Sequence, residues 1–130
     1  MTVKEDDVLH SIYFYRDKNG SSQVEDYLTE LAGMTDKDSR VKLKKIAEYI
    51  KALSIYGTII GQPYVKHIDG DIWELRPIKD RIFFVGWSNG SYVLLHTFVK
   101  KTQKTPKREI EQAKREYEDL KARGLEDEEE

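Results

Sequence analysis

The spacing of apolar residues predicts two α-helices in the first half of the chain. Ser22 and Glu25 match the S-x-x-E capping box, and the apolar residues that follow recur every three or four positions to about Ala32. A second amphipathic stretch begins near residues 36–38 and ends at Gly57, which suits a helix C-terminus. Its apolar stripe consists of Leu43, Ile46, Ala47, Ile50 and Leu53. Because only a short loop separates the two helices, they are predicted to form an antiparallel hairpin.

A shorter apolar period predicts β-strands before and after this hairpin. Residues 8–15 form a predicted first strand, which is followed by the turn sequence Asn19-Gly20. After the helices, tight turns at Asp69-Gly70 and Asn89-Gly90 separate segments with strand character. These segments are 64–68, 72–76, 81–87 and 92–99. Residues 81–87 are almost wholly apolar, so we expect them to form a central strand that is covered on both faces.

A last helix completes the pattern. Pro106 suits the first helical position with Thr105 as its cap, and Gly124 suits the end. Its predicted buried side consists of Ile110, Ala113, Tyr117 and Leu120. The predicted fold is therefore α+β, with an N-terminal strand, a helical hairpin, an antiparallel β-meander and a C-terminal helix. Residues 1–124 are predicted to form a single domain, and residues 125–130 an acidic, disordered tail.

Charge is distributed unevenly along the chain. The formal net charge is only −2, but the acidic residues of 126–130 offset a body with a surplus of basic residues between 100 and 115. Such asymmetry points to a polyanionic partner. The absence of cysteine excludes disulfides and thiolate chemistry and fits a cytoplasmic location. The sequence shows neither a signal peptide nor the roughly 18 apolar residues of a membrane span, so no membrane partner is expected.

The sequence lacks the familiar motifs of phosphate-loop, serine-hydrolase and zinc-protease sites. Its three histidines, His10, His67 and His96, do not have the close spacing of metal ligands, so neither a metal nor another cofactor is expected. Each is better interpreted as structural. His96 lies inside an apolar segment and is expected to be a hydrogen-bonded core residue or to face a partner.

Basic residues gather where the predicted strands end. The short turn 77–80 should bring Arg76 and Arg81 to the same end of neighbouring strands. Lys100 and Lys101 follow the last strand, and whether they join the arginines depends on a strand order that the sequence leaves open. Two interpretations of these cations stay open: a solvated surface, or a surface that converges on a phosphate. The residues of the second alternative are Arg76, Arg81, Lys100, Lys101, Lys104 and Lys107, with Thr102, Gln103 and Thr105 as neutral donors.

Four segments together resemble a known family. They are IWELRP (72–77), DRIFFV (80–85), LLHTFVKKTQKTP (94–106) and EIEQAKREYEDL (109–120). In order and spacing they resemble the RelE/HigB superfamily of bacterial toxins, in particular its phage-derived Gp49-like branch. The resemblance covers most of the chain from residue 64 to residue 120 and is weaker before that.

The resemblance implies the toxin of a type II toxin–antitoxin system. Such toxins are endoribonucleases that cut messenger RNA on the ribosome without a metal and thereby inhibit translation. Their cognate antitoxin in this branch often carries a helix-turn-helix domain, as HigA-like proteins do. Arg76, Arg81, Lys100 and Lys101 match the positions of basic catalytic residues in the family, and Lys104 is a weaker match. The expected RNA-binding residues are Lys104, Thr102, Gln103, Lys107 and Glu74.

Elementary chemistry agrees with these roles. Arginine stays protonated and binds phosphate with two donors, so Arg76 and Arg81 suit charge stabilisation. Neighbouring cations favour the release of a proton from a lysine, so Lys100 or Lys101 suits proton transfer. Glu74 shares a strand face with Arg76 and either acts as a base or orients the arginine; we favour orientation.

Three alternatives remain open from the sequence. A ParE-like protein of the same fold would inhibit DNA gyrase instead of cutting RNA. A non-catalytic binding module of phage origin would dock on a host factor. Finally, the acidic residues 126–130 could either cover the basic site or be solvated.

Overall fold

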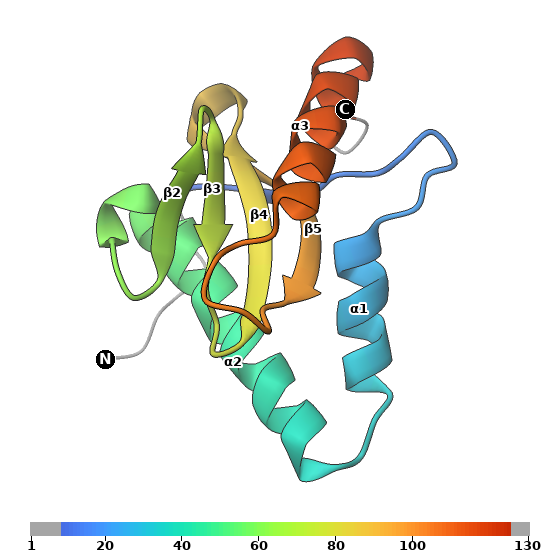
Figure 1. Cartoon of the computed structure of the whole chain (residues 1–130), viewed down its shortest axis with the longest axis vertical. Helices are drawn as coiled ribbons and strands as arrows, with labels where there is room; N and C mark the ends of the chain where they lie inside the picture. Colours follow the sequence, from blue (N-terminus) through green and yellow to red (C-terminus); the bar gives the residue numbers. More distant parts are fainter. Residues whose placement is uncertain (1–8, 126–130) are drawn as a thin grey trace.

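The computed structural model describes residues 9–125, so Val8 and the acidic segment 126–130 lie outside the described residues. The chain forms an α+β fold, as predicted (Figure 1). Its strands are β1 (Ile12–Phe14), β2 (Val65–Asp69), β3 (Ile72–Leu75), β4 (Asp80–Gly86) and β5 (Tyr92–Val99). Its helices are α1 (Gln23–Ala32), α2 (Lys37–Tyr56) and α3 (Lys107–Arg123), with short 3-10 turns η2 (Gly57–Ile60) and η3 (Ser88–Gly90).

The strands form one sheet in the order β1-β5-β4-β3-β2. The meander from β2 to β5 is antiparallel throughout, and β1 adds to the free edge of β5 in parallel. β1 lies within the predicted segment 8–15 and is shorter than that segment. The turn sequences Asp69-Gly70 and Asn89-Gly90 do join paired strands, and both glycines have positive φ angles of 57° and 72°.

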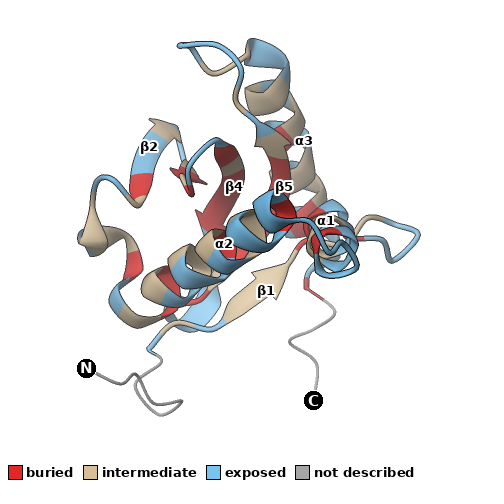
Figure 2. Cartoon of the chain, turned by 90° about the horizontal axis from the view of Figure 1, so that it is seen from below, coloured by how far each residue is buried: buried red, intermediate tan, exposed pale blue. Residues whose placement is uncertain are grey.

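Helices cover both faces of the sheet. α3 packs on one face, and α1 and α2, which diverge from their connecting loop, pack on the other (Figures 1 and 2). β4 shows the consequence for packing: Phe83 and Val85 belong to the core under α3, whereas Ile82 and Phe84 belong to the core under α1 and α2. All four side chains are fully buried, which confirms that this segment is a central strand.

The predicted boundaries of α1 and α2 are confirmed, with two local differences. Ser22 Oγ accepts a hydrogen bond from the Glu25 amide at 3.1 Å, but the Glu25 carboxylate pairs with Arg16 instead of completing the capping box. In α2, Ala47 was placed on the apolar stripe but is exposed. Tyr49 packs against the core instead, because residues 46, 49, 50 and 53 follow the three- and four-residue spacing of one helix face.

The start of α3 also differs from the prediction. Pro106 has φ −61° and ψ 135°, so it is the extended residue that precedes the helix and not its first helical residue. Thr105 makes no capping hydrogen bond to this helix. The fixed φ angle of proline is compatible with either place, and only ψ decides between them. Gly124 ends the helix as predicted, with φ 81°.

A bulge in β5 decides which side chains face α3. Phe83 pairs with His96 and Phe84 with Leu94, so Leu95 is an extra residue in the ladder. Side chains alternate along a strand, and the extra residue therefore moves His96 to the face that Phe83 occupies. His96 lies edge-on to Phe83, with ring centroids 5.5 Å apart.

His96 joins α3 to the sheet. Its Nδ1 lies 2.6 Å from Glu116 Oε1 and its Nε2 lies 3.1 Å from Glu109 Oε1. Burial by itself lowers the pKa of His96, but the hydrogen bonds and negative charges of Glu116 and Glu109 outweigh burial and raise it above its usual value. The prediction that His96 is a hydrogen-bonded core residue is confirmed, and each of its ring nitrogens faces one glutamate carboxylate of α3.

The other end of α3 is held by apolar and polar contacts. Leu120 is buried, Tyr117 packs against the same core as predicted, and the Tyr15 hydroxyl donates to Asp119 at 2.6 Å. Leu125 is buried in this core too, so the first residue of the predicted tail packs with the domain. Among residues 9–125, none of the helices combines the length and the apolar character that a membrane span requires.

We expect the stability of the protein to fall as the pH rises from about 6.5 through the raised pKa of His96. The folded state holds the His96 proton more tightly than the unfolded chain does, so its contribution is complete below the ordinary pKa and disappears above the raised one. Urea unfolding at successive pH values measures this slope. His96→Gln should flatten it, and His67→Gln, in the exposed β2–β3 hairpin, should not. An equally steep slope in His96→Gln would contradict the assignment.

Candidate functional site

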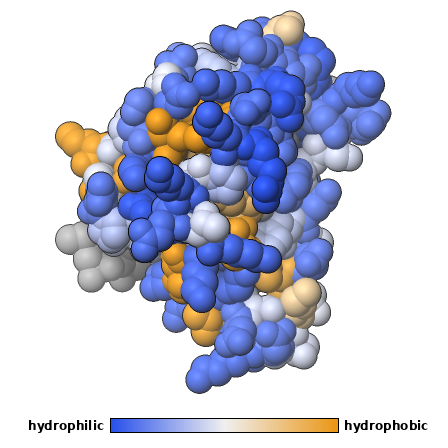
Figure 3. Space-filling view, in the orientation of Figure 1, coloured by the Kyte–Doolittle hydropathy of each residue, from blue (hydrophilic) through white to orange (hydrophobic). Residues whose placement is uncertain are grey.

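An open pocket lies where β4 begins and β5 ends, next to the loop that leads to α3. It has a volume of about 440 Å³. Its lining consists of Ile78, Lys79, Arg81, Lys100, Lys101, Thr102 and Gln103. The loop crosses the face seen in Figures 1 and 3, on which hydrophilic residues predominate. We call the pocket that Ile78, Lys79, Arg81 and residues 100–103 line the basic pocket.

Strand pairing brings the basic pocket together. Arg81 pairs with Phe98 in the β4–β5 ladder, and the Lys100 amide donates to the Lys79 carbonyl at 2.8 Å. The strand order that the sequence left open therefore places Lys100 and Lys101 beside Arg81. Four positively charged side chains, those of Lys79, Arg81, Lys100 and Lys101, line one surface hollow.

Arg76 is joined to this group through a buried carboxylate. Glu74 Oε2 lies 3.4 Å from Arg76 Nε and 3.9 Å from Arg81 Nε. The Glu74 side chain is only 1% exposed, whereas the side chains of Arg81 and Arg76 are 11% and 23% exposed. Glu74 therefore sits beneath the two arginines, on the same face of the sheet, and faces away from solvent.

The charges of this triad are close together, but they are not fully hydrogen-bonded. Neither carboxylate oxygen of Glu74 has a hydrogen-bond partner among the described residues, nor do the buried Nε atoms of Arg76 and Arg81. Buried polar groups are usually satisfied, and unsatisfied ones concentrate at functional sites. Two cations share one carboxylate, so the triad keeps a positive charge that an incoming anion would neutralise.

The Arg81 side chain is held in place by the turn before it. Its Nη1 donates to the Ile78 carbonyl at 2.8 Å and to the Asp80 carbonyl at 2.9 Å. Burial lowers the pKa of Arg81, and the neighbouring Glu74 carboxylate counteracts this. An arginine remains protonated at neutral pH even so. The guanidinium is thus a fixed positive charge at the edge of the pocket.

The remaining predicted site residues lie farther out. Lys104 and Lys107 are exposed, and they do not line the basic pocket. The Thr102 hydroxyl donates to the Lys104 carbonyl at 2.7 Å, which braces the loop. A second hollow of about 420 Å³ lies on the α3 side of the loop and shares Lys101 and Thr102 with the basic pocket.

Three residues near the loop were not among the predicted site residues. Arg108 lines the second hollow, and Ile78 and Lys79 line the basic pocket. Arg108 follows directly on the lysine-rich loop, so its charge could have indicated it. Nothing in the sequence marks Ile78, because its importance lies in a backbone conformation with φ 55°.

The histidines do not form part of this pocket. His10 Nδ1 lies 2.5 Å from the Gly90 carbonyl, and His67 Nε2 lies 2.7 Å from the Gly70 carbonyl. Within residues 9–125, no set of three or more histidine and acidic side chains is arranged to hold a metal ion.

The acidic segment 126–130, predicted either to cover the basic site or to be solvated, lies outside the described residues. Leu125 stands at the opposite end of α3 from the loop that lines the basic pocket (Figure 1).

Comparison with known proteins gives one family match. The model of the family described as phage derived protein Gp49-like (DUF891) matches residues 30–118. This confirms the resemblance to the Gp49-like branch of the RelE/HigB toxins and supports a role as the toxin of a toxin–antitoxin system. No curated protein matches the chain.

The solved structures that are similar to this chain include the crystal structure of an archaeal RelE–RelB complex from Pyrococcus horikoshii OT3, with a TM-score of 0.49 and 12% sequence identity. The similarity covers 71% of this chain and 96% of that chain.

We predict that Glu74→Gln destabilises the protein by roughly 2–3 kcal/mol, because two partly buried arginines lose their counter-charge. The free energy of unfolding from urea titration at pH 7 measures the effect. Glu111→Gln, on the exposed side of α3, is the matched control and should leave the free energy of unfolding within about 0.5 kcal/mol. Equal stability of Glu74→Gln and wild type would show that Glu74 does not compensate the arginines.

Proposed function

This chain belongs to the phage-derived Gp49-like family, and on that premise we propose that it is the toxin of a type II toxin–antitoxin system that cleaves messenger RNA. In this proposal the protein is a metal-independent endoribonuclease that acts on the ribosome and inhibits translation. Its cognate antitoxin is a helix-turn-helix protein of the HigA-like kind. Both statements follow from the resemblance of the family to the RelE/HigB toxins.

The convergence of cations on one open pocket carries the proposal. Arg81, Lys100 and Lys101 line that pocket, and Arg76 adjoins it through Glu74. Like charges repel one another, and an anionic partner would offset that repulsion. Thr102 and Gln103 add neutral polar groups of the kind that bind backbone phosphates. A phosphodiester is the ligand that this combination fits best.

The residues present suit cleavage by the substrate's own 2′-hydroxyl. That oxygen attacks the adjacent phosphorus, the 5′-oxygen of the next nucleotide leaves, and the products are a 2′,3′-cyclic phosphate and a 5′-hydroxyl. In our proposal Arg81 stabilises the extra negative charge of the phosphorane, and Arg76 adds to the positive field from behind. Lys100 or Lys101 transfers the protons at the attacking and leaving oxygens.

Glu74 acts as a positioning residue in this scheme. A carboxylate with a 1% exposed side chain beneath two arginines cannot reach a 2′-hydroxyl in the open pocket without displacing them. Its negative charge instead holds the two guanidinium groups close together against their mutual repulsion. Burial thus favours orientation over the role of general base.

The openness of the pocket agrees with a substrate that is presented by another particle. A shallow basic surface provides charge but few contacts to fix a flexible single strand. A ribosome holds messenger RNA in an ordered conformation and so supplies the orientation that the pocket lacks. Dependence on translating ribosomes is therefore part of the proposal.

We expect the wild-type protein to cut a reporter messenger RNA in a purified translation system, and Arg81→Ala and Lys100→Ala each to lower the cleavage rate by about 100-fold or more. Primer extension maps and quantifies the cuts. Lys44→Ala removes an exposed lysine of α2 outside the basic pocket and should cut at the wild-type rate. Omitting ribosomes should abolish the cuts.

Other outcomes would favour the alternatives of the same fold. Intact messenger RNA together with loss of gyrase supercoiling would support a ParE-like inhibitor. Cleavage that persists at full rate in both Arg81→Ala and Lys100→Ala would place the chemistry outside the basic pocket. A toxic effect that survives both substitutions without any cleavage would indicate a non-catalytic binding module.

A further inference from the structure

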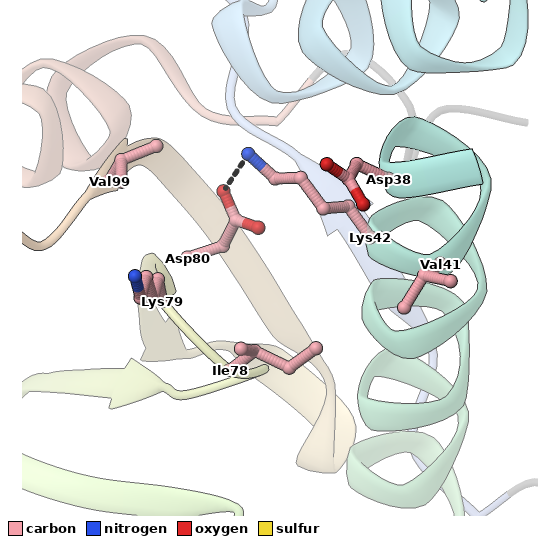
Figure 4. A pocket seen from close by; sticks show the side chains of 7 residues that line it. All are labelled: Asp38, Val41, Lys42, Ile78, Lys79, Asp80 and Val99. Atoms are coloured by element: carbon pink, nitrogen blue, oxygen red, sulfur yellow. Dashed lines mark ion pairs between the residues drawn. The ribbon is translucent and has the colours of Figure 1, made fainter. Parts of the chain in front are cut away.

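A groove adjoins the basic pocket on the other side of the turn between β3 and β4. It has a volume of about 380 Å³ and lies between this turn, the end of β5 and the first half of α2 (Figure 4). Val41, Ile78 and Val99 give it an apolar lining, and its polar groups come from Asp38, Lys42, Lys79 and Asp80. The side chains of Val41 and Ile78 point toward one another across the groove (Figure 4). We call it the apolar groove.

Ile78 is present at a conformational cost. Its φ angle is 55°, in the left-handed region that β-branched residues avoid because of steric crowding at Cβ. Glycine or asparagine would adopt this conformation more readily. Burial does not compensate for the strain, since Ile78 is 52% exposed. A strained residue that leaves an apolar side chain in solvent points to a role in binding.

Two polar groups of the apolar groove, Asp80 and Lys42, are paired within the protein. Asp80 is buried, accepts a hydrogen bond from the Tyr27 hydroxyl at 2.7 Å and pairs with Lys42 Nζ at 3.5 Å. The charges at the base of the groove therefore neutralise one another. What remains for a ligand is chiefly the aliphatic surface of Val41, Ile78 and Val99.

The apolar groove and the basic pocket form one continuous surface. Ile78 and Lys79 line both hollows, and the Ile78 carbonyl also holds the Arg81 guanidinium. A ligand that is longer than the groove therefore continues over Arg81, Lys100 and Lys101. Charge complementarity requires that part of it to be negative.

A polypeptide fits this combination better than a nucleotide base does. Single-stranded nucleic acids are held mainly by stacking on aromatic rings, and the groove lining is aliphatic. An aliphatic side chain between Val41 and Ile78, followed by carboxylates, meets both the apolar and the basic part.

We propose that the apolar groove and the basic pocket together dock an acidic segment of a partner polypeptide, anchored by one aliphatic side chain between Val41, Ile78 and Val99. The docked segment covers Arg81, Lys100 and Lys101 and excludes RNA from them. The inhibitory consequence rests on the function proposed above, whereas the docking itself does not.

The test begins with a random 12-residue peptide library displayed on phage and selected on the immobilised full-length protein. Selected sequences should combine a Leu, Ile, Val or Met with at least two nearby acidic residues. The most enriched peptide is then synthesised with a fluorescent label, and its Kd is measured by anisotropy. Val41→Ser and Ile78→Gly should each raise this Kd by about tenfold or more, because the anchor loses its apolar contacts.

Matched variants separate the parts of the surface. Ile59→Ser removes an isoleucine that is 90% exposed and lies outside the groove, and it should leave the Kd unchanged. The double variant Lys100→Ala/Lys101→Ala should raise the Kd of the peptide by about tenfold or more, because charge pairing is lost. Because Ile78→Gly relieves backbone strain, its unfolding midpoint should not fall, so weaker binding cannot be attributed to loss of fold.

A second probe, a 2′-O-methyl RNA heptamer that cannot be cleaved, distinguishes the other outcomes. Enrichment without the apolar and acidic pattern, or equal peptide affinity of wild type, Val41→Ser and Ile78→Gly, would overturn the docking proposal. The proposal would also be overturned if the groove variants weakened RNA binding and left the peptide Kd unchanged, since the groove would then bind a base. If the peptide behaves as expected but the wild type cuts no messenger RNA, the docking surface stands and the nuclease function fails.

Discussion

The register between β4 and β5 is the constraint on which the candidate site depends. It sets Arg81 opposite Phe98 and ties the Lys100 amide to the Lys79 carbonyl, so the basic residues of two chain segments meet at one end of the sheet. The bulge at Leu95 belongs to the same ladder and turns His96 toward α3. A slip of β5 by one residue would move its side chains to the opposite face of the sheet and turn His96 away from Glu109 and Glu116 of α3.

Two buried groups of charges flank this ladder on the face that α3 covers. In one, His96 is paired with Glu109 and Glu116, and every charge has a hydrogen-bonded partner. In the other, Glu74 lies near Arg76 and Arg81 without satisfied hydrogen bonds. The first docks a helix, and its complete pairing suits a structural role. The second retains unpaired donors and a positive charge next to an open pocket, which suits a role in binding an anion.

The β3–β4 turn lies between the two surfaces to which we assign binding. Its Ile78 carbonyl orients Arg81, and its Ile78 side chain lines the apolar groove. A partner in that groove thus contacts the same turn that positions the proposed catalytic arginine. Substrate binding and inhibition would then compete for one continuous surface, so no structural change is needed to switch the protein off.

The sequence by itself determined the element order, the α+β class and the family, because these depend on apolar periodicity, turn residues and local motifs: Asp69-Gly70, Asn89-Gly90 and the segment 94–106 were sufficient. It also indicated that Arg76 and Arg81 would be close, since a short turn joins them. Only the tertiary structure decided that Lys100 and Lys101 join Arg81, that His96 pairs with two glutamates of α3, and that Ile78 is strained between two hollows. Strand order, a one-residue bulge and a positive φ angle arise from packing between distant segments, and local sequence patterns do not encode them.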